Sequence, residues 1–430
     1  MKRFLFFILV AIVCSQVRSN DYAREVLEEF LDARGAESPI RYERAAKALA
    51  ILAADDNSLH QYVLAVASKE PNFPKSLKVA DKDIEYYILK NRRKISQLAE
   101  KEDNALAYFL LALDRKDKNM LRKAAKGGCV YALNELGTKL LAEVKAKKHS
   151  ILNANKKYFE AFDYFTRASE KRDPTALYNL GFCYLNGFGC TKNTALAIEN
   201  FTRASDMNNP QAMNALGEIY RDGIEVEEDS KKAFLYFAES AKLGNSDGQY
   251  NYAMMLLNDK KGAATNAVIA VSMLEKSAKQ SNVEAMNEYA RCLYESVGVD
   301  YSMTNELAGA EYDAAKALIE KQDAERAHQA IAWWLYCADK IGYPPAMHNL
   351  AKSFMEGRGV DRNEQAAVAW YNRAAKRRYI PSMLSLAECY EKGLGGLKES
   401  RYNANWWRTR SHAERGERNA KIWLSTHKLQ

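Results

Sequence analysis

The chain has 430 residues, of which 47% are hydrophobic and only 8 are proline. This composition supplies enough apolar surface for a folded core, and the scarcity of proline favours long helical segments. The formal net charge is +8, and it falls to +5, from 60 basic and 55 acidic residues, when the first 19 positions are left out. So small an excess does not indicate a nucleic-acid-binding protein, which usually carries a dense basic face.

The N-terminal residues have the pattern of a secretory signal peptide. A basic start precedes ten unbroken apolar residues, Phe4 to Val13, and small or short residues then offer a cleavage site before Asn20. A membrane span needs roughly 20 apolar residues, so this run is too short for a retained anchor. We therefore expect residues 1–19 to be a cleaved leader. A lipoprotein signal through Cys14 is the weaker alternative.

Residues 20–117 are expected to be helical but irregular. Several segments carry apolar residues at helical spacing, Gly35 ends the first of them, and Pro71 and Pro74 interrupt the series. These segments cannot be placed in a common register. They are interpreted either as degenerate repeats or as a separate N-terminal cap.

From about Lys118 onward a helix-loop-helix pattern recurs, which indicates stacked supersecondary units. The first helix of each unit has an apolar stripe at positions i, i+4 and i+8, and the middle residues of successive stripes are 44, 36, 36, 37, 61 and 36 residues apart. These stripes are Ala132/Leu136/Leu140, Ala176/Leu180/Tyr184, Ala212/Leu216/Tyr220, Gly248/Tyr252/Leu256, Ala285/Tyr289/Leu293, Ala346/Leu350/Phe354 and Ser382/Leu386/Tyr390.

The residue after each middle position is always glycine or alanine, as at Gly137, Gly181 and Gly217. Glycine inside a helix costs about 1 kcal/mol relative to alanine, so its recurrence predicts close backbone approach where two helices cross.

The second helix of each unit has its own stripe. The stripes are Ala161/Phe165/Ala168, Ala197/Phe201/Ala204, Ala233/Phe237/Ser240, Ala270/Leu274/Ser277, Ile331/Leu335/Ala338 and Ala367/Tyr371/Ala374. Asn193, Asp229 and Asn363 are expected to cap these helices. Glycine-containing turns such as GFGC and GRGV join first to second helix.

These residues resemble the Sel-one-like repeat (SLR), a relative of the tetratricopeptide repeat. The shared pattern is A-x3-L-G-x2-Y-x2-G-x-G-V followed by A-x2-[WY]-[YF]-x-[KR]-A, and residues 347–376 match it almost column by column. The resemblance covers about residues 118–430. It implies an all-α, right-handed superhelical solenoid of helix-turn-helix repeats. Proteins of this family are usually adaptors in multiprotein assemblies, exported by bacteria or working in endoplasmic-reticulum quality control.

Six cysteines follow the leader, and the sequence does not choose among their 15 pairings. They are Cys129, Cys183, Cys190, Cys292, Cys337 and Cys389. Cys183, Cys292 and Cys389 share one repeat position, where a small buried thiol is the plain interpretation. A cysteine-rich bacterial branch of the family carries one disulfide per repeat and reportedly binds penicillin. The matching positions here, Ser205 and Ala212, are not cysteines.

Two segments interrupt the period. Residues 144–157 are expected to lengthen one turn by about eight residues, and the segment from about Val299 to Arg326 is expected to form an additional helix. Repeat insertions often map to a binding face. A helix that merely repacks the solenoid explains the second insertion equally well.

No catalytic, cofactor or metal motif is apparent, so we expect a protein without enzymatic activity and without a cofactor. The six histidines have no paired spacing for zinc. Asn200 begins the one glycosylation sequon, inside a predicted helix, where modification is not expected.

Most aromatic residues fall in repeat positions: Tyr164, Tyr236, Trp334, Trp370 and Trp407 are assigned to one core position of the second helix. Trp333 and Trp406 lie beside that position and are expected to point to another face. Together with Arg408 and Arg410 they are the candidate partner-binding residues, because exposed tryptophan and arginine are typical of binding hot spots. Sealing of the last repeat is the alternative for the terminal aromatics.

The C-terminal end is basic. From Arg373 onward there are 13 Lys/Arg against 5 Asp/Glu, a net +8. An anionic partner could bind there, although a solvated helix face is the plainer interpretation.

The sequence thus predicts an exported, non-catalytic scaffold that binds protein through a helical-repeat surface, in a bacterial periplasm or medium or, in a eukaryote, in the endoplasmic-reticulum lumen. The alternatives are a cell-wall-directed small-ligand protein or weak hydrolase, and a luminal quality-control adaptor.

Overall fold

The computed structural model describes residues 117–146, 151–258, 263–299 and 310–429, together with Ser96 and a few single positions between 105 and 112. The expected leader, 1–19, and nearly all of region 20–117 lie outside the described residues. The chain divides into two compact units, residues 1–248 and 249–430. Each unit is described by itself below.

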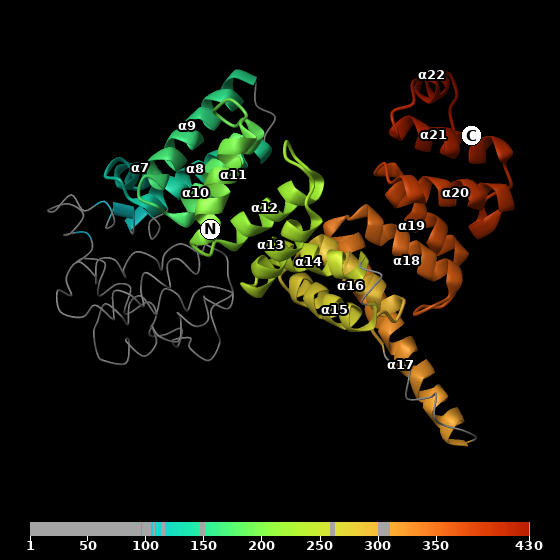
Figure 1. Cartoon of the computed structure of the whole chain (residues 1–430). Helices are drawn as coiled ribbons and strands as arrows, with labels where there is room; N and C mark the ends of the chain where they lie inside the picture. Colours follow the sequence, from blue (N-terminus) through green and yellow to red (C-terminus); the bar gives the residue numbers. More distant parts are fainter. Residues whose placement is uncertain are drawn as a thin grey trace. The chain divides into compact units, whose positions relative to one another are not determined.

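The N-terminal unit consists of stacked helix pairs (Figure 1). Within this unit each first helix packs against the second helix of its own repeat, and the first two second helices also pack against the first helix of the repeat that follows. The helices are α7 (Lys118–Lys126), α8 (Val130–Ala146), α9 (Ile151–Ser169), α10 (Pro174–Asn186), α11 (Thr194–Asp206), α12 (Pro210–Asp222) and α13 (Ser230–Lys242).

The C-terminal unit repeats the arrangement, and it begins within α14. Its helices are α14 (Ser246–Asn258), α15 (Ala263–Lys279), α16 (Val283–Tyr294), α17 (Ala310–Leu335), the π-helical turn η3 (Tyr336–Ile341), α18 (Pro344–Glu356), α19 (Glu364–Lys376), α20 (Ile380–Lys392), the short 3-10 helix η4 (Leu394–Gly396), α21 (Arg401–Glu414) and α22 (Arg418–Thr426). No strand occurs in the described parts of either unit, so the predicted all-α helical-repeat solenoid is confirmed.

Local sequence explains where the helices begin and end. The side-chain oxygens of Asn193, Asp229 and Asn363 each accept a backbone N–H bond at 2.9 Å, which confirms the predicted caps of α11, α13 and α19. At the other end, α10 and α18 stop at Gly187 and Gly357, both with positive φ.

The second glycine of each turn packs on the preceding repeat. A Cβ added at Gly359 would lie 2.7 Å from the carbonyl oxygen of Ala327, and one at Gly189 would overlap the carbonyl oxygen of Tyr158. In the turn GIEV the equivalent residue is Glu225, with φ 56°, whose carboxylate pairs with Lys192 at 2.7 Å. The turns therefore serve packing between repeats.

The recurring small residue lies where the two helices of a repeat cross. A Cβ added at Gly217 would lie 2.5 Å from Cε1 of Phe237, and one at Gly181 would lie 2.8 Å from Cδ1 of Phe201. Both phenylalanine rings are fully buried. The predicted close approach is thus confirmed, with an aromatic ring as the approaching group.

The first period break lengthens helices rather than a turn. Compared with the 13-residue α10 and α11, helix α8 continues to Ala146 and α9 already begins at Ile151. The expected longer turn at residues 144–157 was therefore wrong, because both segments keep helical hydrogen bonding into the extra residues.

The second break also differs from expectation. Helix α17 is one continuous helix of 26 residues, whose N-terminal half extends away from its neighbours in the C-terminal unit (Figure 1). The described part of the insertion thus lengthens a second helix instead of forming an additional one.

The register of α17 was wrong by one residue. Trp334 is 2% exposed and takes the core position assigned to Leu335, which is 47% exposed. The apolar pattern Ile331/Leu335/Ala338 gave Leu335, but the π-helical turn η3 accommodates one extra residue before α18 starts. Trp333 accordingly occupies the position of Tyr164, Tyr236, Trp370 and Trp407.

Within the described part of the chain, no helix combines the length and the apolar character that a membrane crossing requires.

Candidate interaction surface

The first helices carry a mostly polar face beside the apolar core stripe, and some of its side chains are buried. It consists of the fifth and sixth residues of each first helix, and we call it the first-helix face. In the N-terminal unit it comprises Asn134, Glu135, Tyr178, Asn179, Asn214 and Ala215; in the C-terminal unit it comprises Tyr250, Asn251, Asn287, Glu288, His348, Asn349, Leu384 and Ser385. The fifth position holds asparagine, tyrosine, histidine or leucine and never a charged residue. Charged residues are depleted and tyrosine is enriched in the centres of protein interfaces.

Amide side chains of this face join successive first helices. Nδ2 of Asn134 donates to Oδ1 of Asp173 at 2.8 Å, and Nδ2 of Asn349 donates to Oδ1 of Asn287 at 3.1 Å. Burial raises the pKa of Asp173, while its bonds from the Ala176 N–H and the Asn134 amide lower it. The face is therefore held in place by polar contacts between repeats.

His348 is the partly buried histidine of this face. Its Nδ1 lies 3.0 Å from the hydroxyl oxygen of Ser382, and its ring contacts the rings of Tyr371 and Tyr379 at 5.3 and 5.6 Å. Burial, and then the charge of Lys352, lower the pKa of His348 to about 4. The imidazole is thus neutral at physiological pH and acts as a polar, aromatic surface group.

The four predicted partner-binding residues lie in the C-terminal unit but on different helices. Trp333, on α17, packs edge-on against Tyr289 at 5.9 Å. Trp406, on α21, packs edge-on against Trp407 at 5.0 Å, and its indole N–H donates to the carbonyl oxygen of His427 at 3.1 Å. Both tryptophans are partly exposed.

The two predicted arginines are engaged with carboxylates. Arg408 makes a two-pronged contact with Glu391 at 2.5 and 3.1 Å, and Arg410 pairs with Glu414 at 2.9 Å. Trp406, Arg408 and Arg410 lie on the same helix, α21, but contact different neighbours. Trp333 lies on a different helix, α17, and contacts Tyr289.

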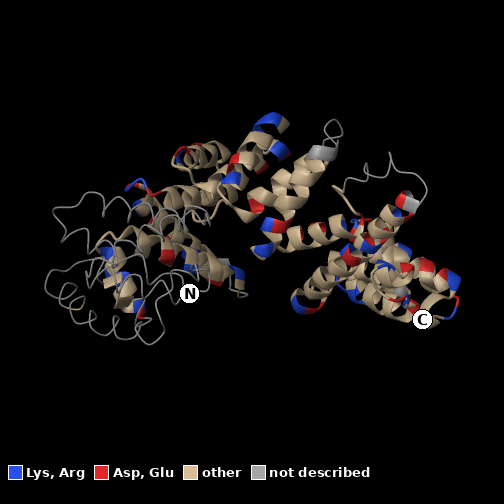
Figure 2. Cartoon of the chain, turned by 90° about the horizontal axis from the view of Figure 1, so that it is seen from below, with Lys and Arg blue, Asp and Glu red and all other residues tan. Residues whose placement is uncertain are grey.

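Several cations of the basic C-terminal end are engaged in local contacts. Arg378 pairs with Glu414 at 2.6 Å, and the guanidinium of Arg373 lies over the ring of Trp370 at 4.1 Å. In Figure 2, Lys/Arg and Asp/Glu are interspersed along the helices of this unit. An anionic partner at this end therefore stays a prediction.

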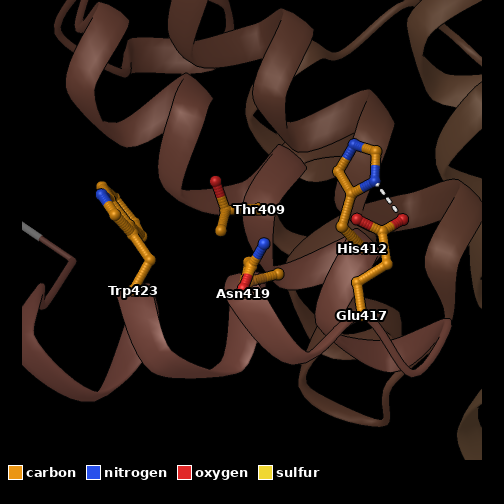
Figure 3. Close-up of a pocket in the computed structure, with 6 residues that line it drawn as sticks. Thr409, His412, Glu417, Asn419 and Trp423 are labelled. Carbon is orange, nitrogen blue, oxygen red and sulfur yellow. Dashed lines mark hydrogen bonds and ion pairs between the residues drawn. The ribbon is translucent and has the colours of Figure 1, made fainter.

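A depression of about 320 Å³ lies between α21 and α22 (Figure 3). Thr409, His412, Glu417, Asn419 and Trp423 line it, and Nδ1 of His412 donates to Oε1 of Glu417 at 2.8 Å. The two side chains are 47% and 55% exposed, so water screens the pair. This pair can bind a polar group at the surface; acid–base catalysis would require a reacting group held in hydrogen-bond reach.

Most of the cysteines, and the asparagine of the sequon, are buried within the repeats. The six cysteines after the leader are free thiols, and burial raises the pKa of Cys183 to about 12. Asn200 is 5% exposed and its amide donates to the carbonyl oxygen of Leu196 at 2.8 Å, so a glycan has no access. In the described residues no group of three or more metal-binding side chains comes together.

The first-helix face was missed by sequence reasoning, although its signal is present. The fifth position lies two residues before the middle residue of each first-helix stripe. Aligning the repeats residue by residue would have shown that this position never holds a charged residue. The contacts that organise the face link residues 30 or more positions apart.

Comparison with known proteins identifies the repeat. The Sel1 repeat, which is the Sel-one-like repeat introduced above, matches residues 153–173, 174–209, 210–245, 246–282, 344–379 and 380–407. The unmatched stretch 283–343 contains α16 and the long α17, so the helix pair persists where the sequence pattern is interrupted.

Two solved structures share the fold. A Sel1 repeat protein from Oxalobacter formigenes aligns with a TM-score of 0.50 and 18% identity, over 64% of this chain and 96% of that one. A protective antigen present in uropathogenic Escherichia coli strains, which displays an SLR fold, aligns with a TM-score of 0.53 and 19% identity, over 97% of this chain and 88% of that one. No curated protein matches the chain.

Proposed function

Because the chain belongs to the Sel1-like repeat (SLR) family, we propose that it is an exported, non-catalytic scaffold that binds proteins on its first-helix face. Sel1 repeats suggest a helical-repeat scaffold for protein interactions, and proteins with this repeat are generally non-catalytic adaptors. Export is part of the proposal and rests on the expected leader at residues 1–19.

One observation carries the proposal: the fifth position of the first helices never holds a charged residue, and in four of the seven helices its side chain is partly exposed, at Tyr178, Tyr250, His348 and Leu384. A face that only had to stay soluble would be occupied by lysine and glutamate. Tyr178 and Tyr250 instead offer rigid amphipathic surface, and Asn287 and Asn134 are held by neighbouring repeats. Ordered aromatic and amide groups lose little entropy when a partner binds, which favours recognition.

Site-specific photo-crosslinking in the source cells tests the proposal. A benzophenone amino acid is placed at Tyr178 or Leu384, on the first-helix face, and at Leu235 or Val268, which are 63% and 55% exposed on second helices. We expect discrete protein adducts from the two face positions and none from the two control positions. Adducts equally distributed over all four positions, or no adduct at all, would contradict the proposal.

A further inference from the structure

One repeat of the N-terminal unit carries two cysteines on either side of the turn between its helices. Cys183 lies in the last turn of α10 and is fully buried, and Cys190 ends the turn GFGC and is partly exposed. Sγ of Cys190 lies 3.5 Å from the carbonyl oxygen of Cys183. Both side chains pack in the apolar cluster that contains Phe165 and Leu180. The fold therefore places the second thiol beside the residue that carries the first.

Backbone hydrogen bonds hold the two cysteines in this arrangement. The N–H of Phe188 donates to the carbonyl oxygen of Cys183 at 3.0 Å, and the N–H of Asn193 donates to the carbonyl oxygen of Tyr184 at 2.9 Å. Because a carbonyl oxygen lies about 2.4 Å from its own Cα, Sγ of Cys190 lies within about 6 Å of Cα of Cys183. A change of side-chain rotamer can then bring the two sulfur atoms into bonding distance.

The same two positions are paired in other repeats. In the next repeat they hold Ile219 and Val226, which pack in one apolar cluster. Cys292 and Cys389 occupy the first position in later repeats, where the second position holds valine or glycine. The repeat of α10 and α11 is the one in which both positions are cysteine. Since a reduced thiol packs like a small apolar group, this pair preserves the core and adds the chemistry of a dithiol.

We propose that Cys183 and Cys190 form a reversible disulfide when the folded chain meets a low-molecular-weight disulfide such as oxidised glutathione. The thiolate of the partly exposed Cys190 attacks the small disulfide, forms a mixed disulfide with one half of it and releases the other half as a thiol. The thiolate of Cys183 then attacks the sulfur of Cys190 and releases the second small thiol. The two protein thiols thereby lose two protons and two electrons, which the small disulfide takes up in becoming two thiols.

This bond closes the turn through which the repeat packs on the preceding one. Phe188 lies between the two cysteines, and its ring stacks on the ring of Tyr158 of α9 at 4.4 Å. Gly189 packs on the backbone of the same tyrosine. A cross-link removes open conformations of this turn from the unfolded chain, so the oxidised N-terminal unit is the more stable form.

Peptide mapping of the full chain before and after oxidation tests the proposal. Trypsin should release residues 173–192 as one peptide, which contains both cysteines and no other. The folded chain is reduced, exposed to oxidised glutathione, treated with N-ethylmaleimide in denaturant and digested. We expect this peptide to carry two maleimide groups before oxidation. After oxidation it should carry none and be lighter by two hydrogens than the dithiol peptide, while the other cysteines that follow the leader are modified in both samples.

Thermal unfolding of the reduced and oxidised chains measures the constraint on the turn. The oxidised N-terminal unit should unfold at a temperature higher by roughly 3–8 °C. Cys190→Val introduces the residue of the next repeat, so this variant should fold, form no bond and unfold at the same temperature with and without oxidation. The matched control Cys389→Ser removes a thiol from the equivalent first-helix position of another repeat, and it should form the bond as the wild type does.

Three results would overturn the disulfide. The first is a peptide 173–192 that still takes up two maleimide groups after oxidation, the second is a mixed disulfide with glutathione that persists at Cys190, and the third is a bond from Cys190 to a cysteine outside this peptide. A rise in unfolding temperature that Cys190→Val shows as well would contradict the constraint on the turn.

Discussion

The two units build the same repeat with different residues where its helices cross. In the N-terminal unit glycine faces phenylalanine, as at Gly217 and Phe237. In the C-terminal unit the small residue is alanine and the second-helix residue is leucine, tryptophan or tyrosine, as in the buried pair of positions Ala253 and Leu274. The small residue of the first helix and the large residue of the second helix share the space at the crossing. The sizes of these two side chains must therefore be complementary in each unit.

The units also differ in what their first helices present. In the N-terminal unit, Asp173 and Asn209 cap the first helices, and Asn134, Tyr178 and Asn214 occupy the fifth position. In the C-terminal unit the last two repeats have tyrosine at the cap, and His348 takes the fifth position. The N-terminal unit thus keeps the residues that stabilise the repeat, while the C-terminal unit replaces several of them with aromatic surface.

The largest effect is expected from disturbing the crossing. Gly217→Ala should destabilise the N-terminal unit by about 1–2 kcal/mol, because the overlap with Phe237 outweighs the gain in helix propensity. Adding Phe237→Leu, which copies Ala253 and Leu274, should recover part of the loss. Urea unfolding followed by far-UV circular dichroism measures the change.

Tryptophan fluorescence supplies an internal control for that measurement. All six tryptophans lie in the C-terminal unit, so their unfolding transition should not move. Additive effects of Gly217→Ala and Phe237→Leu would show that the two positions do not share space, and would contradict the pairing.

Acid should affect the C-terminal unit through His348. Its folded-state pKa of about 4 lies below the unfolded value of 6.5. The unfolded chain therefore binds more protons between these values, and the stabilisation that is full above pH 6.5 is lost as the pH falls toward 4. Between pH 7.5 and 4.5 the full shift would correspond to about 2.5 kcal/mol, and because the ring is partly exposed we expect a loss of about 1–2 kcal/mol. His348→Asn, which introduces the amide of Asn287 and Asn214, should remove that part of the pH dependence.

Urea unfolding followed by tryptophan fluorescence at both pH values checks this expectation. If wild type and His348→Asn lose equal stability on acidification, the histidine is not buried in its neutral form.

The smallest effect is expected at the helix starts. Asn282→Ala should destabilise the C-terminal unit by about 1 kcal/mol, because the N–H of Ala285 loses its partner. Tyr343→Asn should stabilise the unit by about 0.5 kcal/mol, since the new cap is partly offset by lost aromatic contact. Thermal unfolding of both variants gives the comparison. A clear destabilisation by Tyr343→Asn would mean that the tyrosine is needed for packing.

Much of the fold could be predicted from short-range patterns. The apolar stripes, the caps at Asn193 and Asn363 and the small residue at the crossing depend on spacings of three to eight residues, which a helix converts directly into faces. The wrong predictions arose where a local irregularity changed the number of residues in a helix or in the turn that follows it. The π-helical turn η3 exchanged the roles of Trp334 and Leu335, and helix continuation replaced the expected longer turn before α9 and the expected separate helix before α17.

By itself, the amino-acid sequence determined the helical-repeat architecture and the core stripes of the repeats other than α17, because these follow from periodicity along one chain segment. Only the tertiary structure decided which surface residues meet. Asn134 reaches Asp173, and Tyr379 reaches His348, across 39 and 31 positions. Such contacts depend on how successive repeats stack, and no spacing within one helix specifies that stacking.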